Sequence, residues 1–219
     1  MAGRPRSIDD AVILQAAVRV MGRTGPARLT LAAVAGEVGL VAGTLVQRFG
    51  SKRGMLVALA ERSAQEAGEQ RVRVRAEHAS PLAALAALTG GAWSGVASAE
   101  EFANHLAFLC ADLADPELHR LALAAQQAEE AAVRALLEEA VAAGELLPGT
   151  DTALLARSVQ AATTGAGVLW AVDREGTLAG RRLLALDTAL RPHLHSHPHP
   201  HPHPHPHPHL HPDDEEVTP

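Results

Sequence analysis

Apolar residues along most of the chain recur at the spacing of amphipathic helices, and no segment alternates strictly between apolar and polar residues as a half-buried strand does. Short breaks with Gly, Pro or an N-capping Ser, Thr or Asp separate the helical segments. The expected helices cover roughly residues 8–24, 31–38, 42–49, 52–76, 81 to at least 93, 99 to at least 109, 116–144, 152–172 and 177–191. The pattern therefore predicts an all-α protein of about nine helices, the first of them capped by Ser7.

Two of the expected helices, 31–38 and 42–49, are short and are joined at Gly39. The hydroxyl of Thr30 is expected to accept a hydrogen bond from an amide in the first turn of the first helix. Gly39 can adopt the left-handed conformation that ends a helix, and the second helix then begins after Val41. Such a pair is typical of a helix-turn-helix, whose second helix lies in the major groove of DNA.

The segment from near Ile13 to Leu56 resembles the DNA-binding domain of the TetR family of transcriptional regulators. The residues that carry the resemblance are Thr30, Val34, Ala35, Gly39, Gly43, Thr44, Leu45, Phe49, Ser51, Lys52 and Leu56. It implies an N-terminal three-helix DNA-binding domain (1–54) and a helical ligand-binding and dimerisation domain (55–192). It also implies a homodimeric repressor that binds double-stranded operator DNA and is released by a small-molecule effector. A plain helical hairpin inside an all-helical protein is the alternative.

Eight residues are expected at the DNA on this resemblance. They are Thr30, Ala42, Gly43, Thr44, Val46, Gln47, Arg48 and Lys52. The family usually has Ser where this chain has Val41, and Tyr where it has Val46. Valine cannot cap a helix, which costs about 0.5–2 kcal/mol of helix stability. We therefore expect base and backbone contacts to rest on the polar members of the set, Thr44, Gln47, Arg48 and Lys52.

Charge is distributed unevenly along the chain. Residues 1–62 hold nine Arg and Lys against four Asp and Glu, although the net charge of the whole chain is -6. A basic N-terminal part on an acidic body is typical of a DNA-binding module attached to another domain. Lys52 and Arg53 also stand in the first turn of a helix, where the macrodipole disfavours cations. An anionic neighbour such as DNA phosphate would explain them, and surface solubility is the alternative.

Composition and motifs exclude several other classes of protein. No stretch reaches the roughly 20 apolar residues needed to cross a bilayer, and no signal peptide is visible. The single cysteine, Cys110, fits a reducing compartment, so a cytoplasmic location is expected. There is no nucleophile with a matched base, no phosphate loop and no framed pair of carboxylates. We therefore assign no catalytic residue and no cofactor.

The resemblance places an effector pocket among the fifth to eighth helices. The candidate ligand-binding residues are Trp93, Phe102, His105 and Phe108, with Leu109 and Cys110 nearby. Core packing is the alternative role for each of them. The effector itself cannot be identified from these residues, because too few polar anchors accompany them.

The last two helices are expected to form the dimer interface. Apolar residues at helical spacing are Leu155, Val159, Ala162, Ala166 and Leu169 on the first helix, and Leu183, Leu186 and Leu190 on the second. The run 161–167 contains only small residues, which permits close helix approach. The alternative is that these residues form the core of a monomer.

The tail, residues 193–219, has histidine at every second position from His193 to His211, mostly alternating with proline. Proline at this density precludes helix and sheet and favours a disordered polyproline II strand. Successive histidines then point in different directions, so no single rigid metal chelate is expected and no metal ligand is assigned. A metal-handling or metal-sensing protein that acts through this tail is nevertheless the alternative function.

Overall fold

The computed structural model describes residues 8–91 and 93–195, and every regular element in them is helical. The elements are α1 (Asp10–Arg28), α2 (Leu31–Glu37), α3 (Ala42–Phe49), α4 (Lys52–Glu77), α5 (Pro81–Gly91), α6 (Ala99–Asp112), α7 (Pro116–Ala142), α8 (Thr152–Asp173), α9 (Leu178–Leu190) and the 3-10 turn η1 (Arg191–His193). The prediction of an all-α protein of about nine helices is confirmed for this part of the chain.

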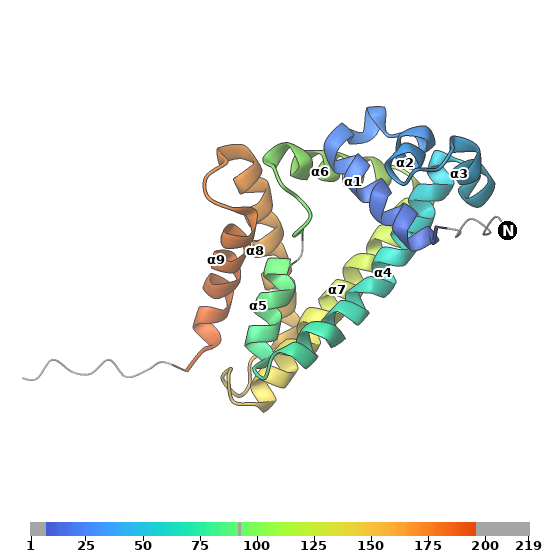
Figure 1. Cartoon of the computed structure of the whole chain (residues 1–219). Coiled ribbons are helices and arrows are strands. Elements are labelled where there is room, and N and C mark those ends of the chain that lie inside the picture. The colour runs from blue at the N-terminus through green and yellow to red at the C-terminus, as the bar shows by residue number, and fades with distance from the viewer. Residues whose placement is uncertain (1–7, 92, 196–219) are drawn as a thin grey trace, which may run out of the picture.

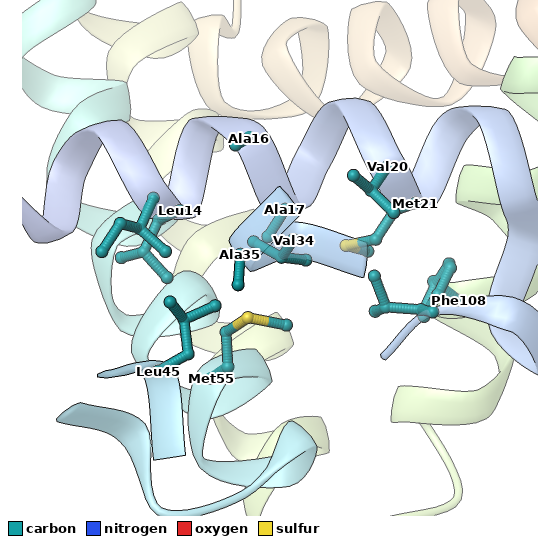
Figure 2. Close-up of a cluster of buried hydrophobic side chains, with 12 residues drawn as sticks. Leu14, Ala16, Ala17, Val20, Met21, Val34, Ala35, Leu45, Met55 and Phe108 are labelled. Atoms are coloured by element: carbon teal, nitrogen blue, oxygen red, sulfur yellow. The ribbon is translucent and has the colours of Figure 1, made fainter. Parts of the chain in front are cut away.

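The first three helices form a compact head at one end of the molecule (Figure 1). Its core is made by apolar faces that meet between α1, α2 and α3 (Figure 2). The fully buried side chains include Ile13, Ala17, Val34, Leu45 and, from α4, Met55. Phe108 of α6 joins the same cluster, so the head shares its core with the body.

Side-chain caps begin α2, where one was expected from Thr30, and α4. The Thr30 hydroxyl accepts from the Ala33 amide at 3.1 Å, and the Ser51 hydroxyl accepts from the Gly54 amide at 3.0 Å. Gly39 has a φ of 70°, the left-handed conformation that the turn requires. The two caps begin α2 and α4, and Gly39 follows the end of α2, where the sequence places them.

The first helix differs from the expectation at both ends. Ser7 lies outside the described residues, and the side chain of Asp9 caps α1 by accepting from the Ala11 amide at 3.0 Å. At the other end, Gly25 has a φ of 69° and a ψ of 177°, which kinks the helix just before Pro26. The chain then makes one more turn, so α1 ends at Arg28 rather than near Thr24.

The longest helices, α4 and α7, run side by side in the same direction from the head into the body (Figure 1). At the end near the head, Arg53 pairs with Asp115, which directly precedes α7. At the far end, Arg75 pairs with Glu139. Two ion pairs separated by most of the helix length therefore hold α4 parallel to α7.

The body is completed by α5 and α8, which pack against α7, and by α9, which packs on α5 and α8 (Figure 1). Their common core contains four residues that were expected at a dimer interface: Leu155, Val159, Leu186 and Leu190. For these four residues the interface prediction is wrong, because their helix face points inward. The outward faces carry Leu169 and Leu183, which were also expected at the interface, together with Leu154, Val168 and Val172 of α8 and Leu184 of α9.

Helix α6 crosses from the head to the body. Its Asn104 side chain donates to the carbonyl oxygen of Gly22 in α1 at 2.6 Å, and its Phe102 packs with Trp170 of α8. Trp93, expected inside the fifth helix, lies beyond the end of α5 at Gly91 and has a φ of 69°. The glycines that surround it let the helix end before it is reached.

The described chain ends at His195, slightly inside the expected tail. The Leu147 amide donates to the carbonyl oxygen of His193 at 2.8 Å, and Leu194 packs on the body core. The body therefore extends past residue 192. The rest of the His/Pro segment, with the metal-handling role considered for it, lies outside the described residues.

Among the described residues, no single helix is long and apolar enough to cross a membrane. Helices α2 and α3 meet the length and composition criteria only as a pair, and they are bent by 114° relative to each other.

Candidate nucleic-acid interface and ligand cavity

Helix α3 presents its early residues on the surface of the head. Gly43, Val46 and Gln47 are exposed, Ala42 and Thr44 are half-buried, and Leu45 anchors the helix in the core. Val41 makes no side-chain capping bond, as expected from its missing oxygen. Short polar and aliphatic side chains with one free amide, that of Gln47, can approach base edges in a groove.

Arg48 is directed at the head itself. Its Nη1 donates to the carbonyl oxygen of Ile8 and to the Asp10 carboxylate, the latter at 2.8 Å. These bonds tie the end of α3 to the beginning of α1. The guanidinium therefore positions α3. If Arg48 also bound a DNA phosphate, its guanidinium would have to bind Asp10 and the phosphate at the same time.

Lys52 and Arg53 also have partners within the chain. Lys52 Nζ donates to the carbonyl oxygen of Pro26 at 2.8 Å, next to the kink of α1. Arg53 binds both carboxylate oxygens of Asp115, and its Nη1 lies 2.8 Å from Glu117. The hydrogen bond from Arg53 lowers the pKa of Asp115 to about 2. For Arg53, the anionic neighbour expected from the sequence is therefore found within the chain, in Asp115 and Glu117 at the beginning of α7.

Thr30 lies exposed at the first turn of α2, where its hydroxyl caps the helix. A second acidic centre of the head, Glu37, was not singled out from the sequence. Its carboxylate binds Arg23 at 2.6 Å and Arg19 at 3.4 Å, and the bond to Arg23 is the main reason why its pKa is lowered. Two arginines of the basic segment are therefore neutralised, which leaves a smaller cationic surface than the residue count implies.

A cavity of about 610 Å³ lies where the head meets the body. Its wall combines α1 (Met21, Gly22), α4, α6, α7 and the segment 93–97. Trp93, His105 and Phe108, three of the four predicted ligand-binding residues, line it. Phe102 does not line it and instead supports Trp93 from behind, with ring centroids 5.2 Å apart. Leu109 also lines this cavity, whereas Cys110 is exposed elsewhere on α6.

His105 of α6 is a titratable group in this wall that lies against Gly22 of α1. Burial lowers the pKa of its imidazole, and the charge of Glu101 opposes that shift. A Cβ atom at Gly22 would lie 2.9 Å from His105 Nε2, so the glycine allows α6 to approach α1 closely. The absence of a side chain at Gly22 is what makes this close contact between α1 and the His105 ring possible.

A second cavity, of about 770 Å³, adjoins the first and lies among α4, α5, α7, α8 and α9. Trp93 and Leu109 belong to both walls, so the two spaces meet at these side chains. The most unusual wall residue is Arg182, which is only 5% exposed. It was not among the predicted residues, although its position midway between Leu178 and Leu186 on α9 places it on the buried helix face.

No group of three or more His, Cys, Asp or Glu side chains that could hold a metal ion occurs in residues 8–91 and 93–195. The polar groups near the cavities are instead single residues attached to helices. This arrangement suits the binding of an organic ligand by shape and a few polar contacts.

Comparisons with known proteins agree with this geometry. Residues 13–59 match the family model described as "Bacterial regulatory proteins, tetR family". The repressor SmeT of the Stenotrophomonas maltophilia multidrug efflux pump SmeDEF superposes with a TM-score of 0.63 at 22% identity, over 86% of this chain and 92% of SmeT. No match to the sequence is found among curated proteins.

Two further solved structures show the same fold. FadR of Bacillus subtilis, solved in complex with stearoyl-CoA, has a TM-score of 0.62 and 19% identity, over 83% of this chain and 98% of FadR. A TetR transcription regulator of Haloarcula marismortui has a TM-score of 0.69 and 14% identity, over 85% and 98% of the two chains. Residues 13–59 thus carry the domain that defines the tetR family of bacterial regulatory proteins, and the chain has the fold of solved TetR-family transcriptional regulators over 83–86% of its length.

Proposed function

We propose that this protein is a homodimeric transcriptional repressor that binds a palindromic operator and leaves it when a small molecule occupies the cavity between head and body. One observation carries the proposal. The 610 Å³ cavity is walled by Met21 and Gly22 of the DNA-binding head and by Trp93, His105 and Phe108 of the body. A ligand bound there touches both parts at once, so it can favour one relative position of the two over another.

Helix α3 is the recognition helix in this proposal. Gln47 and Thr44 reach base edges, while the amide and side-chain groups at Thr30 and Lys52 contact phosphates on either side. Val46, half exposed beside Gln47, makes an apolar contact of the kind that suits a thymine methyl group. Arg48 holds the helix at the correct angle through Asp10.

Dimerisation uses the outward face of α8 and α9. Leu169 and Leu184 are 62% and 61% exposed in the protomer, and Leu154 and Val172 continue the apolar face of α8. Exposed apolar side chains that gather on one face mark an interaction surface. A two-fold axis would bring this face of one protomer against the same face of its partner. The two heads of the dimer would then address two half-sites of a palindrome.

Release follows from the contacts that bridge the cavity. Asn104 holds α6 to α1 through the Gly22 carbonyl, and Arg53 and Arg75 hold α4 to α7. A ligand that displaces α6 therefore moves α1, and a ligand that spreads α4 from α7 moves the start of α4. Either shift changes the separation of the two recognition helices, which must match the spacing of successive major grooves.

Relatives of this fold support a ligand-responsive role. The FadR structure contains stearoyl-CoA, and SmeT represses an efflux pump. Both are regulators whose body has the same helical arrangement. We accordingly place the protein in the cytoplasm, where operator DNA and a metabolite or drug would both reach it.

A gel-shift titration with the DNA flanking the protein's own gene tests the proposal. The wild-type protein should bind a specific fragment as a dimer, with an affinity that falls steeply with salt. Lys52→Ala should weaken binding to all fragments and reduce the salt slope by about one. A metabolite panel added to the complex should include at least one compound that releases the DNA.

The same titration, repeated with a chain that ends at His195, separates the metal-handling alternative from the repressor. Unchanged binding by the shortened chain, with and without added Zn²⁺ or Ni²⁺, would leave the regulator function with residues 1–195. Binding to no fragment at low salt would refute the proposed function outright.

A further inference from the structure

Arg182 is a buried cation without a carboxylate partner among the described residues. Its Nε donates to the carbonyl oxygen of Thr89 at 3.3 Å and its Nη1 to that of Thr163 at 3.4 Å. Both bonds are long, and both acceptors are neutral. Buried arginines are usually paired with an acidic group, because a charge in a low-dielectric site is costly unless it is compensated.

The third nitrogen, Nη2, reaches the second cavity. Nη2 forms no hydrogen bond with a described residue. In the described part of the chain, no side-chain nitrogen or oxygen is both fully buried and without a hydrogen-bond partner, so Nη2 is not fully buried. Nη2 is therefore accessible, and the cavity that Arg182 lines is where this access lies. The guanidinium thus presents free N–H donors to an empty space inside the body.

The other charged groups of this cavity do not cancel Arg182. Glu66 of α4 pairs with Arg62, and His119 lies on α7. Glu129 of α7 is exposed and lies beyond ion-pair distance of Arg182, although its charge raises the pKa of the guanidinium against the larger, lowering effect of burial. The positive charge of Arg182 therefore remains available to a ligand.

Apolar side chains line part of the cavity that Arg182 borders. Leu88, Val133, Trp93 and Leu109 belong to its wall, and the last two also line the first cavity, which borders α1. A molecule with one anionic end and an apolar body fits both features. Its anionic end would compensate the guanidinium, and its apolar part would extend towards the head.

We propose that Arg182 is the anchor for the anionic group, a carboxylate or a phosphate, of an amphipathic effector whose apolar chain passes between Trp93 and Leu109 towards α1. The inference rests on the proposed ligand-released function and names its ligand class. A charge-assisted contact between Nη2 and an oxyanion is the strongest polar interaction that this cavity can offer. It also explains why arginine stands on the buried face of α9.

Calorimetric titration of the full-length protein with decanoate, decyl phosphate and decanol tests the proposal. These probes share an apolar chain and differ in the head group. At least one anion should bind about ten- to a hundredfold more tightly than decanol, and the better anion identifies the head group. Arg182→Gln should abolish that preference while decanol binding stays within about twofold.

Two variants control for charge and folding. Arg181→Gln removes the same charge from the adjacent position, where the side chain pairs with Asp173 outside both cavities, and should leave all affinities unchanged. Glu129→Gln removes the opposing exposed charge and should tighten anion binding without affecting decanol. Retained decanol binding shows that Arg182→Gln is folded.

Equal affinity of the wild-type protein for all three probes would overturn the proposal. So would equal weakening of anions and decanol by Arg182→Gln, which would make Arg182 a structural residue. The gel shift gives an independent result: anion binding that does not release DNA leaves the Arg182 site in place and refutes ligand release. DNA binding with no anion site refutes only the present inference.

Discussion

Arg53 at the beginning of α4 and Asp115 at the N-terminus of α7 are joined by two hydrogen bonds, of 2.9 and 3.0 Å. The same carboxylate caps α7 by accepting from the amides of Glu117 and Leu118. The Asp115 side chain thus caps the beginning of α7 and also binds Arg53 in the first turn of α4. With Arg75 and Glu139 at the far end, it makes α4 and α7 behave as one unit.

The Asp115 interaction predicts a pH-dependent contribution to stability. Its pKa is lowered from 3.8 to about 2 by the hydrogen bond from Arg53, so its contribution is complete above the unfolded value of 3.8. The contribution is lost as the pH falls through about 2. Asp115→Asn keeps a capping side chain and removes the charge, so its melting temperature should stay a constant amount below that of the wild type from neutrality to about pH 4 and approach it as the pH falls from about 4 to about 2. Thermal melts at a series of pH values measure this; a difference between the two proteins that stays constant down to about pH 2 would contradict it.

Two adjacent residues of α3 should have different roles, Gln47 in recognising the base sequence and Arg48 in positioning the helix. Gln47 is exposed, so Gln47→Ala should leave the melting temperature unchanged and relax base preference by about 1–3 kcal/mol at one operator position. Arg48 is bound to Ile8 and Asp10, so Arg48→Ala should lower the free energy of unfolding by about 1–2 kcal/mol and weaken binding to all sequences. Selection from a random DNA library and thermal melts provide the two readouts. A changed base preference in Arg48→Ala alone would reverse the assignment.

Local rules were sufficient for the head and for most helix ends. Thr30, Ser51, Ser98 and Thr177 each cap the helix that they precede, and Gly39 has the predicted positive φ. A cap depends on an oxygen and an amide a few residues apart, so the sequence alone determines it. The helix-turn-helix was predictable for the same reason.

Contacts between distant segments were not predictable by these rules. Arg48 lies 38 residues from its partner Asp10, and Lys52 lies 26 residues from its partner Pro26. Helical spacing shows that Leu155 belongs to an apolar face, but it does not show whether that face points to a core or to a second subunit. Arg182 illustrates the reverse case, since a cation on a buried face signals a site that only the fold can locate.

The small residues of α8 should differ sharply in their tolerance of a methyl group. A Cβ at Gly167 would lie 2.7 Å from the Phe102 ring, whereas a Cβ at Gly165 meets nothing within 4 Å in the protomer. Gly167→Ala should therefore lower the free energy of unfolding by about 1–3 kcal/mol. Gly165→Ala should raise it by up to about 1 kcal/mol, because alanine favours the helix. Urea denaturation measures both, and equal losses would mean that a partner subunit rather than Phe102 limits the space on α8.

The outward face of α8 and α9 should decide the oligomeric state. Leu169→Glu places a charge in the middle of the proposed two-fold contact, where it would be desolvated without a partner, so the variant should be monomeric by light scattering. Val72→Glu is the matched control, because Val72 of α4 is similarly exposed, at 58%, and lines neither cavity. It should remain dimeric. Because Leu169 is exposed in the protomer, the monomeric variant should keep its helical circular dichroism and lose tight operator binding, since each single head addresses only one half-site. A Leu169→Glu protein that is still a dimer would place the interface elsewhere on the chain.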